Sequence, residues 1–186
     1  MENNKIRVLM IGPARNVKGG MTTVVDNYFK YGLDKLVDLK YVETCNDSNK
    51  LAKFIKEKKG NREFNKEIDN CDIVHVHMAS RRSTFRKGKY VRIAKRKGKK
   101  VIIHIHGGCF KKFYSDCNER EKKYVRETLN LADNIIVLSE EWKQYFKNLT
   151  TENKIIIIYN SVKIPQDFQK FFYNKKVLFL GRIVKR

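Results

Sequence analysis

The sequence has no hydrophobic run long enough to cross a bilayer. Its longest apolar run, residues 155–159, is far short of the about 20 residues that a spanning helix needs. It also has no N-terminal segment with a charged start, an apolar stretch and a small-residue cleavage site. The four cysteines show none of the paired spacings of a zinc site, and free thiols suit a reducing compartment. We therefore expect a cytoplasmic protein, either soluble or bound peripherally at the inner face of the cell membrane.

Acidic residues are scarce. The 186-residue chain has 41 lysines and arginines against 20 aspartates and glutamates, which gives a net charge of +21. Such a charge favours anionic partners, which include nucleic acid, acidic lipid head groups and phosphorylated substrates. An excess of lysine over arginine with abundant asparagine is also what an AT-rich genome produces without any functional cause. Hydrophobic residues make up 41% of the chain, which is enough for the core of one ordinary domain.

The N-terminal stretch predicts a strand, a glycine-containing loop and a helix. Residues 6–11 are nearly all apolar and precede a Gly-Pro pair, as is typical of a short buried strand. After Gly19 and Gly20, the apolar residues have the spacing of one helix face. Because a helix N-terminus has unpaired N–H groups and glycines let an anion approach it, residues 18–23 are a candidate phosphate site. The alternative is a simple loop end, since the spacing G-x-G-x-x-G and the P-loop pattern are both absent.

Along the rest of the chain, short apolar stretches alternate with amphipathic segments. The further predicted strands are residues 36–42, 71–78, 100–106, 134–138, 154–159 and 176–181. The predicted helices lie at residues 51–55 and 64–68, with a break at Gly60, at residues 83–97 and 118–132, and after a cap at Ser139. Such alternation produces parallel strands joined by right-handed crossovers. We therefore predict a doubly wound, Rossmann-like α/β domain with helices on both faces and ligands at the carboxyl ends of its strands.

All four histidines lie in two H-x-H units, His75 with His77 and His104 with His106. Residues two apart on a strand share a face, so each unit directs two imidazoles the same way near a carboxyl end. One interpretation is a transition-metal site, which would need a further ligand, and Asp72 lies at the wrong end of its strand. Another is core histidines satisfied by nearby backbone, which suits the deeper His75 and His104. The third is a substrate-facing residue, for which His106 fits best and His77 second.

Two segments combine basic and apolar residues. Residues 85–100 have the pattern of a basic amphipathic helix, which can lie on an anionic bilayer or can pack its apolar stripe on the sheet. Residues 110–114, FKKFY, could add an aromatic and basic lip. The net charge also permits nucleic-acid binding. However, the charge is spread over many segments and no known binding motif appears, so only salt-sensitive, nonspecific affinity would be expected.

Taken in order, the strand and loop sequences resemble the N-terminal domain of the family 4 retaining glycosyltransferases, which have the GT-B fold. The matching pieces are KIRVLMIG with KGGMTTVV, DIVHVHMAS, KVIIHIHGG, ADNIIVLSEEW, IIIIYNSV and VLFLGRIVKR. The resemblance implies two Rossmann-like domains facing each other across a cleft, with the acceptor bound by the first and the nucleotide-sugar donor by the second. It implies that residues 1–174 form the acceptor-side domain and that residues 175–186 are the first strand of a donor-binding domain that is otherwise missing.

The resemblance also implies roles for individual residues. It places His106 beside the transferred sugar as the catalytic residue, with Gly107 allowing close approach. Further residues that would contact substrate or the donor diphosphate are Gly19, Gly20, Ser139, Glu140, Asn160, Arg182 and Lys185. Two of these depart from the family pattern, because serine follows Asn160 and arginine follows Lys185 where the family has glycine. With His77 at the neighbouring strand tip, these residues make up the candidate site.

We therefore expect a glycosyltransferase that transfers a sugar from a nucleotide-sugar to a polysaccharide or lipid-linked acceptor. We expect no metal, and no cofactor beyond the donor itself. The family's two donor-side glutamates, eight residues apart, have no place in the sequence. The chain alone is thus expected to be incomplete and inactive, with a C-terminal domain or a partner chain completing it. The alternatives are a basic nucleic-acid-binding domain and a metal-dependent hydrolase built on the H-x-H pairs.

Overall fold

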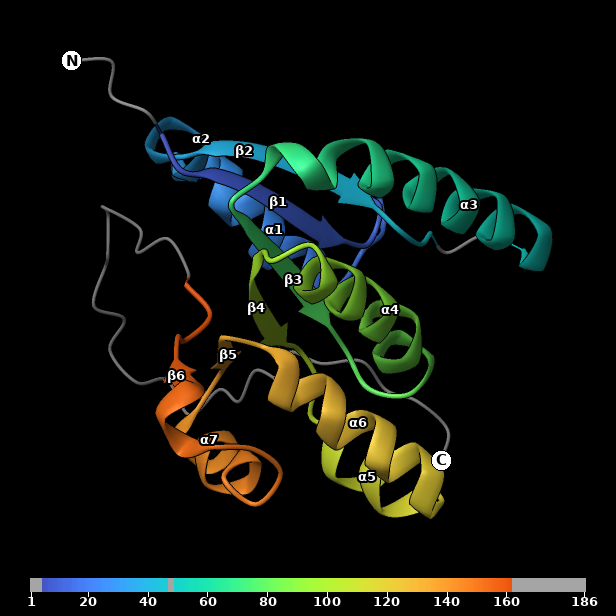
Figure 1. The fold of residues 1–186 in the computed structure, drawn as a ribbon, viewed down its shortest axis with the longest axis vertical. Helices are drawn as coiled ribbons and strands as arrows, with labels where there is room; N and C mark the ends of the chain where they lie inside the picture. Colours follow the sequence, from blue (N-terminus) through green and yellow to red (C-terminus); the bar gives the residue numbers. More distant parts are fainter. Residues whose placement is uncertain (1–4, 47–48, 162–186) are drawn as a thin grey trace, which may run out of the picture.

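The computed structural model describes residues 5–46 and 49–161 (Figure 1). Its centre is a six-stranded, all-parallel sheet in the order β2-β1-β3-β4-β5-β6. The strands are β1 (Arg7–Gly12), β2 (Asp38–Glu43), β3 (Ile73–Met78), β4 (Lys100–Ile105), β5 (Asn134–Val137) and β6 (Ile155–Ile157). The α-helices are α1 (Gly20–Lys30), α2 (Leu33–Leu36), α3 (Lys50–Glu67), α4 (Arg82–Arg96), α5 (Phe110–Asp116), α6 (Glu119–Leu131) and α7 (Glu140–Phe146).

The observed strands confirm the predicted ones. Five of them are short runs of mainly apolar residues, as in IVHVHM for β3 and III for β6, because a parallel sheet is covered on both faces. The edge strand β2, DLKYVE, is half charged. The alternation of strands with helices confirms the predicted doubly wound α/β fold. The seventh predicted strand, residues 176–181, and the predicted domain boundary at residues 174–175 lie outside the described residues.

One face of the sheet carries most of the hydrophobic core. Alternate strand residues point to it, among them Val74 and Val76 of β3 and Val101 and Ile103 of β4, all fully buried. Helices α3 to α7 supply the opposing side chains, which include Phe64, Tyr90, Val91, Phe110, Val125, Leu129 and Phe146. Burial of this many apolar side chains is the main force that holds these helices on the sheet.

The opposite face of the sheet carries the histidines and is covered by α1 and α2 (Figure 1). The Tyr28 ring of α1 lies 5.8 Å from the His75 ring, and Phe29 of α1 stacks edge-on against Tyr41 of β2. Farther along the sheet this face is more open, since Ile156 of β6 is 42% exposed. Helices therefore cover both faces, as predicted, but unequally.

Helix α3 is continuous through Gly60, so the predicted break at this glycine is wrong. The glycine serves packing instead. A Cβ at Gly60 would lie 2.6 Å from the carbonyl oxygen of Glu43 at the end of β2, closer than real Cβ contacts come. Gly60 therefore allows α3 to lie directly against the strand backbone.

Substitution of Gly60 by alanine is expected to lower the free energy of unfolding by about 1–3 kcal/mol, because the new methyl group overpacks this contact. In an open helix the same change would stabilise the chain by up to about 1 kcal/mol. Urea unfolding followed by circular dichroism measures the difference. Lys59→Ala, on an exposed position one residue away, is the control and should stay within about 0.5 kcal/mol. A Gly60→Ala chain that is more stable than the wild type would contradict the packing role.

The two basic segments proposed for membrane contact do not present their apolar residues to solvent. Tyr90, Val91 and Ala94 of α4 are at most 2% exposed and pack in the core, so the packed interpretation of residues 85–100 is the correct one. Phe110 and Phe113 of α5 are also buried, and the predicted aromatic lip is therefore wrong. In the ranges that the structure describes, no helix combines the length and hydropathy required to cross a membrane.

Candidate functional site

Most of the predicted site residues lie along the carboxyl edge of the sheet. They lie at the ends of five neighbouring strands. Gly19 and Gly20 follow β1, His77 is one residue before the end of β3, His106 and Gly107 follow β4, Ser139 and Glu140 follow β5, and Asn160 follows β6. The carboxyl edge is where ligands bind in open parallel sheets. Arg182 and Lys185 lie outside the described residues.

Helix α1 begins at this edge without a capping side chain. Gly19 is its N-cap and Gly20 its first residue, and no side-chain hydrogen bond satisfies its first N–H groups. A Cβ at either glycine would meet no atom within 4 Å, so neither glycine is required by packing in the described chain. The open space and the free N–H groups suit the approach of an anion.

Ser139 caps α7 as the sequence predicts. Its hydroxyl oxygen accepts a hydrogen bond from the backbone N–H of Trp142, at a distance of 3.3 Å. Glu140 and Glu141 occupy the first turn, where negative charge suits the helix dipole. This local role explains both the serine and the acids. A substrate-binding role for Ser139 and Glu140 stays a prediction.

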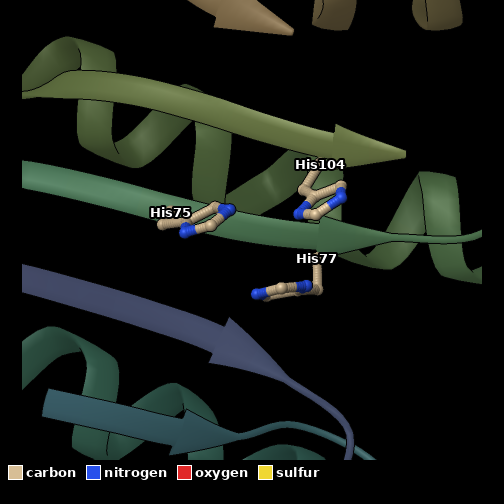
Figure 2. A group of neighbouring side chains, drawn as sticks. All are labelled: His75, His77 and His104. Atoms are coloured by element: carbon tan, nitrogen blue, oxygen red, sulfur yellow. The ribbon is translucent and has the colours of Figure 1, made fainter. Parts of the chain in front are cut away.

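The four histidines form one buried column between the sheet and α1. They are at most 7% exposed, and their ring centroids lie 4.1–5.7 Å apart. Figure 2 shows His75 and His77 on β3 with His104 beside them on β4. His77 Nδ1 and His106 Nε2 lie 2.8 Å apart and share a hydrogen bond. The two predicted substrate-facing histidines are therefore in direct contact.

Burial keeps these imidazoles neutral. Desolvation lowers the pKa of His75 to about 3, of His104 to about 4 and of His106 to about 2, and it lowers the pKa of His77 well below its ordinary value. The charges of neighbouring histidines add to the lowered pKa of three of the four rings. A neutral imidazole offers one donor and one acceptor nitrogen, so His106 can hydrogen-bond a substrate but does not act as a cation near neutral pH.

Three of the histidines could hold a metal ion by geometry alone. One ring nitrogen from each of His75, His77 and His104 lies within 4.8 Å of the others, and Nε2 of each is buried without a hydrogen-bond partner. Electrostatics opposes this interpretation. Burial and the charges of other histidines and of Lys87 lower the pKa values of these rings. A divalent cation here would have only neutral imidazole ligands and would lie near the positively charged Lys87, which disfavours it.

The core interpretation of His75 and His104 is therefore the better one, with one correction. Both are buried as expected, but their Nε2 atoms are not hydrogen-bonded to backbone. The Tyr28 hydroxyl lies 3.5 Å from His104 Nδ1, at the limit of a hydrogen bond. The sheet therefore carries these rings at a cost in unsatisfied polar atoms, which is unusual for a native core.

Lys87 of α4 belongs to this region, although its place in a basic stretch gives little sequence signal. Its side chain is fully buried, its ammonium group donates a hydrogen bond to the His77 carbonyl, and it lies 3.8 Å from Met21 Sδ. It therefore joins the end of β3 to the first turn of α1. Burial lowers the pKa of Lys87 to about 7. The burial of Lys87 has one sequence signal. Lys87 lies three residues after Thr84 and three before Tyr90, which places it on the apolar face of the helix.

Arg81 is a second residue that the sequence did not indicate. It precedes α4 at the carboxyl edge, is exposed, and has a φ of 62°. It has the one positive φ outside glycine among residues 5–46 and 49–161. Such backbone strain is often found at ligand sites, and it places a guanidinium group at this edge. One arginine in a basic stretch gives no sequence signal for this conformation.

Asn160 lies in a groove of about 360 Å³ between α1 and the chain that follows β6. Tyr28 and His104 also line the groove, and Asn27 of α1 donates a hydrogen bond to the Ser161 carbonyl at 3.0 Å. The groove therefore connects the histidine column to the surface. A larger hollow, of about 970 Å³, lies beside α3 and is lined by none of the predicted site residues.

The parallel sheet, with an open helix start and histidines at its carboxyl edge, defines a Rossmann-like α/β domain of the kind that binds ligands at that edge. The chain matches the sequence model of Glycosyltransferase Family 4 over residues 19–164. It belongs to this family, which confirms the resemblance.

Comparisons with solved structures and with curated proteins give no further information on function. Among solved structures, a 2-deoxyribosyltransferase from the psychrotolerant bacterium Bacillus psychrosaccharolyticus is similar, with a TM-score of 0.41 and 10% sequence identity over 82% of this chain and 98% of that chain. A likeness this distant supports no conclusion about function. No curated protein matches the chain.

Proposed function

We propose that this chain is the acceptor-side half of a glycosyltransferase that moves a sugar from a nucleotide-sugar to a polysaccharide or lipid-linked acceptor. Its family membership supports the class of reaction. One observation carries the proposal. The uncapped start of α1, at Gly19 and Gly20, and the hydrogen-bonded His77–His106 pair lie at the same edge of the sheet. The donor is a substrate, and the proposal requires no metal or other cofactor.

His106 is the proposed catalytic residue. Its hydrogen bond to His77 occupies Nε2 and leaves Nδ1 as the nitrogen for a substrate hydroxyl. Gly107 has a φ of 137°, which favours glycine, and a Cβ there would meet nothing within 4 Å. A sugar could therefore approach the backbone beside His106 closely.

The donor diphosphate or the acceptor is proposed to meet the start of α1, with Arg182 and Lys185 reaching the diphosphate. Ser139 and Glu140 are proposed to line the cleft, and Asn160 is a further proposed substrate contact. In transfer from a nucleotide-sugar, positive groups and helix termini stabilise the departing diphosphate. The described carboxyl edge supplies one helix terminus for the diphosphate, the start of α1. The positive groups on the other side of the diphosphate would come from a C-terminal domain or a partner chain. A lipid-linked acceptor would place the reaction at the inner face of the cell membrane.

The 186-residue chain, assayed by itself, is expected to transfer no sugar at a useful rate, because the described carboxyl edge offers only one set of groups for the diphosphate. Incubation with several nucleotide-sugars and lipid-linked acceptors, followed by measurement of released nucleotide, tests this. Clear turnover would refute this expectation.

Binding tests the proposed function itself. Titration calorimetry with lipid-linked sugar acceptors and with nucleoside diphosphates should detect a ligand, and Gly19→Val should weaken at least one of them about tenfold or more. Because a Cβ at Gly19 meets nothing, the variant should fold, with a loss of stability limited to about 1 kcal/mol from the poorer helix cap. The absence of binding to every acceptor would contradict an acceptor-side role.

A further inference from the structure

Helix α3 exposes three large apolar side chains on one face. Leu51, Phe54 and Ile55, which we call the α3 patch, are 68%, 55% and 59% exposed. Positions i, i+3 and i+4 of a helix are neighbours, so the three side chains form one surface. Single exposed apolar residues are common, but a cluster on one helix turn indicates a contact surface.

The α3 patch points away from the core. The same helix buries Gly60 and Phe64 against the sheet, and these residues lie roughly 130–170° around the helix axis from the patch. Figure 1 shows that the amino-terminal part of α3 extends beyond the carboxyl end of β2. The patch therefore makes no contribution to the core of the described chain, and its apolar character needs another explanation.

Lysines flank the α3 patch on one side. Lys58 and Lys59 are exposed about one turn farther along the helix, and the Lys58 ammonium lies 4.7 Å from the centre of the Phe54 ring. Lys53 is exposed on the opposite side of the helix. The hollow beside α3 is lined by Lys56, Lys59, Arg62 and Lys66 together with Glu43 and Glu63, so its charge is basic on balance. Exposed apolar side chains next to lysines suit the interface of an anionic membrane, where the lysines reach lipid phosphates.

We propose that the α3 patch docks this chain on an anionic membrane surface, with its three apolar side chains among the acyl chains and its lysines on lipid phosphates. Charge complementarity selects this occupant. Two copies meeting through the patch would bring two sets of lysines together, which repel each other. Nucleic acid would use the lysines but would leave Leu51 and Ile55 without a favourable contact.

The position of the patch agrees with this orientation. Helix α3 follows β2, so its amino-terminal half lies at the carboxyl edge of the parallel sheet, where the candidate site also lies. Docking through the patch would direct that edge toward the lipid. The inference goes beyond the proposed sugar transfer, because it depends only on the surface of α3 and is tested without any sugar.

The apolar contribution is tested by sedimentation of the full chain with vesicles of phosphatidylglycerol and phosphatidylcholine at low salt. The wild type should bind these vesicles and should not bind phosphatidylcholine alone. The triple variant Leu51→Gln, Phe54→Gln and Ile55→Gln keeps the charge and the helix propensity, and it should bind at least about tenfold more weakly. All three positions are exposed, so its melting temperature should match the wild type.

The electrostatic contribution has a matched control. Lys53→Gln with Lys58→Gln and Lys59→Gln should weaken vesicle binding about tenfold or more, since each lysine near an anionic surface contributes about a fivefold factor. The control removes the same charge from exposed positions on α5 and α6, with the substitutions Lys112→Gln, Arg120→Gln and Lys123→Gln. It should change binding by no more than about twofold.

Several results would overturn the proposal. They are a wild-type chain that stays in the supernatant with anionic vesicles at low salt, a glutamine triple variant on the α3 patch that binds as well as the wild type, and a control that weakens binding as much as the α3 lysine variant. A dimer in light scattering that the patch variant abolishes, or RNA binding without vesicle binding, would also overturn it. None of these results bears on sugar transfer, so the two proposals fail independently.

Discussion

Lys87→Met is expected to stabilise the chain at and below neutral pH, although it removes a hydrogen bond. Methionine has a similar length and no charge, so it fills the same space without burying an ammonium group. The gain should be on the order of 2–3 kcal/mol below pH 7, after about 1–3 kcal/mol is lost with the hydrogen bond to the His77 carbonyl.

The pH dependence of stability follows from the lowered pKa of Lys87. Burial lowers this pKa from 10.5 to about 7, so the unfolded chain binds the proton more tightly than the folded chain between these values. Stability should therefore rise as pH rises from about 7 to about 10, by up to about 5 kcal/mol from this group alone. Below pH 7 the folded chain carries the full cost of burying the charged Lys87 ammonium group. In Lys87→Met this rise should disappear.

Urea unfolding at a series of pH values measures both effects. Lys89→Met, on an exposed position of the same helix, is the control and should reproduce the wild-type pH dependence. A Lys87→Met chain that is less stable than the wild type at pH 6, with an unchanged pH dependence, would contradict a buried and easily deprotonated lysine.

Phe110→Ala should lower the free energy of unfolding by about 3–5 kcal/mol, because it removes a fully buried ring and leaves a cavity. The Phe110 ring lies 5.5 Å from the Phe113 ring and 4.9 Å from the Phe146 ring, so it joins α5 to α7. A loss of this size is a large share of the stability of an ordinary domain and could leave the chain partly unfolded.

Phe54→Ala is the matched control for Phe110→Ala. Phe54 is 55% exposed on α3, so its truncation should change the free energy of unfolding by no more than about 0.5 kcal/mol. Guanidinium unfolding followed by circular dichroism gives both values. Equal losses at the two positions would show that the core does not include Phe110.

The strands could be predicted from the sequence because both of their faces are covered. A strand of this kind is an apolar run such as RVLMIG or IVHVHM, with turn residues after it, and few other structures produce that pattern. The order of the strands along the chain then determines the parallel sheet and the location of its carboxyl edge.

The helices were harder to predict because periodicity reports a stripe but not what the stripe touches. The stripe on α4 packs on the sheet, whereas Leu51, Phe54 and Ile55 on α3 stay outside it. The sequence predicts a helix break at Gly60, because no local pattern reveals that the carbonyl oxygen of Glu43 would lie 2.6 Å from a Cβ at this position.

The candidate site was predictable at the strand ends and not elsewhere. His77 and His106 were identified because they follow apolar runs, and the structure brings them into contact. Lys87 and Arg81 come from α4 and its N-cap. Their importance depends on tertiary burial and on one backbone angle, which no local pattern encodes.

The histidine column also affects how the chain can be studied with chemical reagents. Acylating reagents that modify imidazoles need access to a ring nitrogen, and all four rings are almost fully shielded from solvent. The modification rate of His75, His77 and His104 in the native chain is therefore set by how often the sheet opens, whereas His106 should react first if its Nδ1 faces the substrate as proposed. Labelling of more than one histidine per chain would thus measure transient opening of the fold.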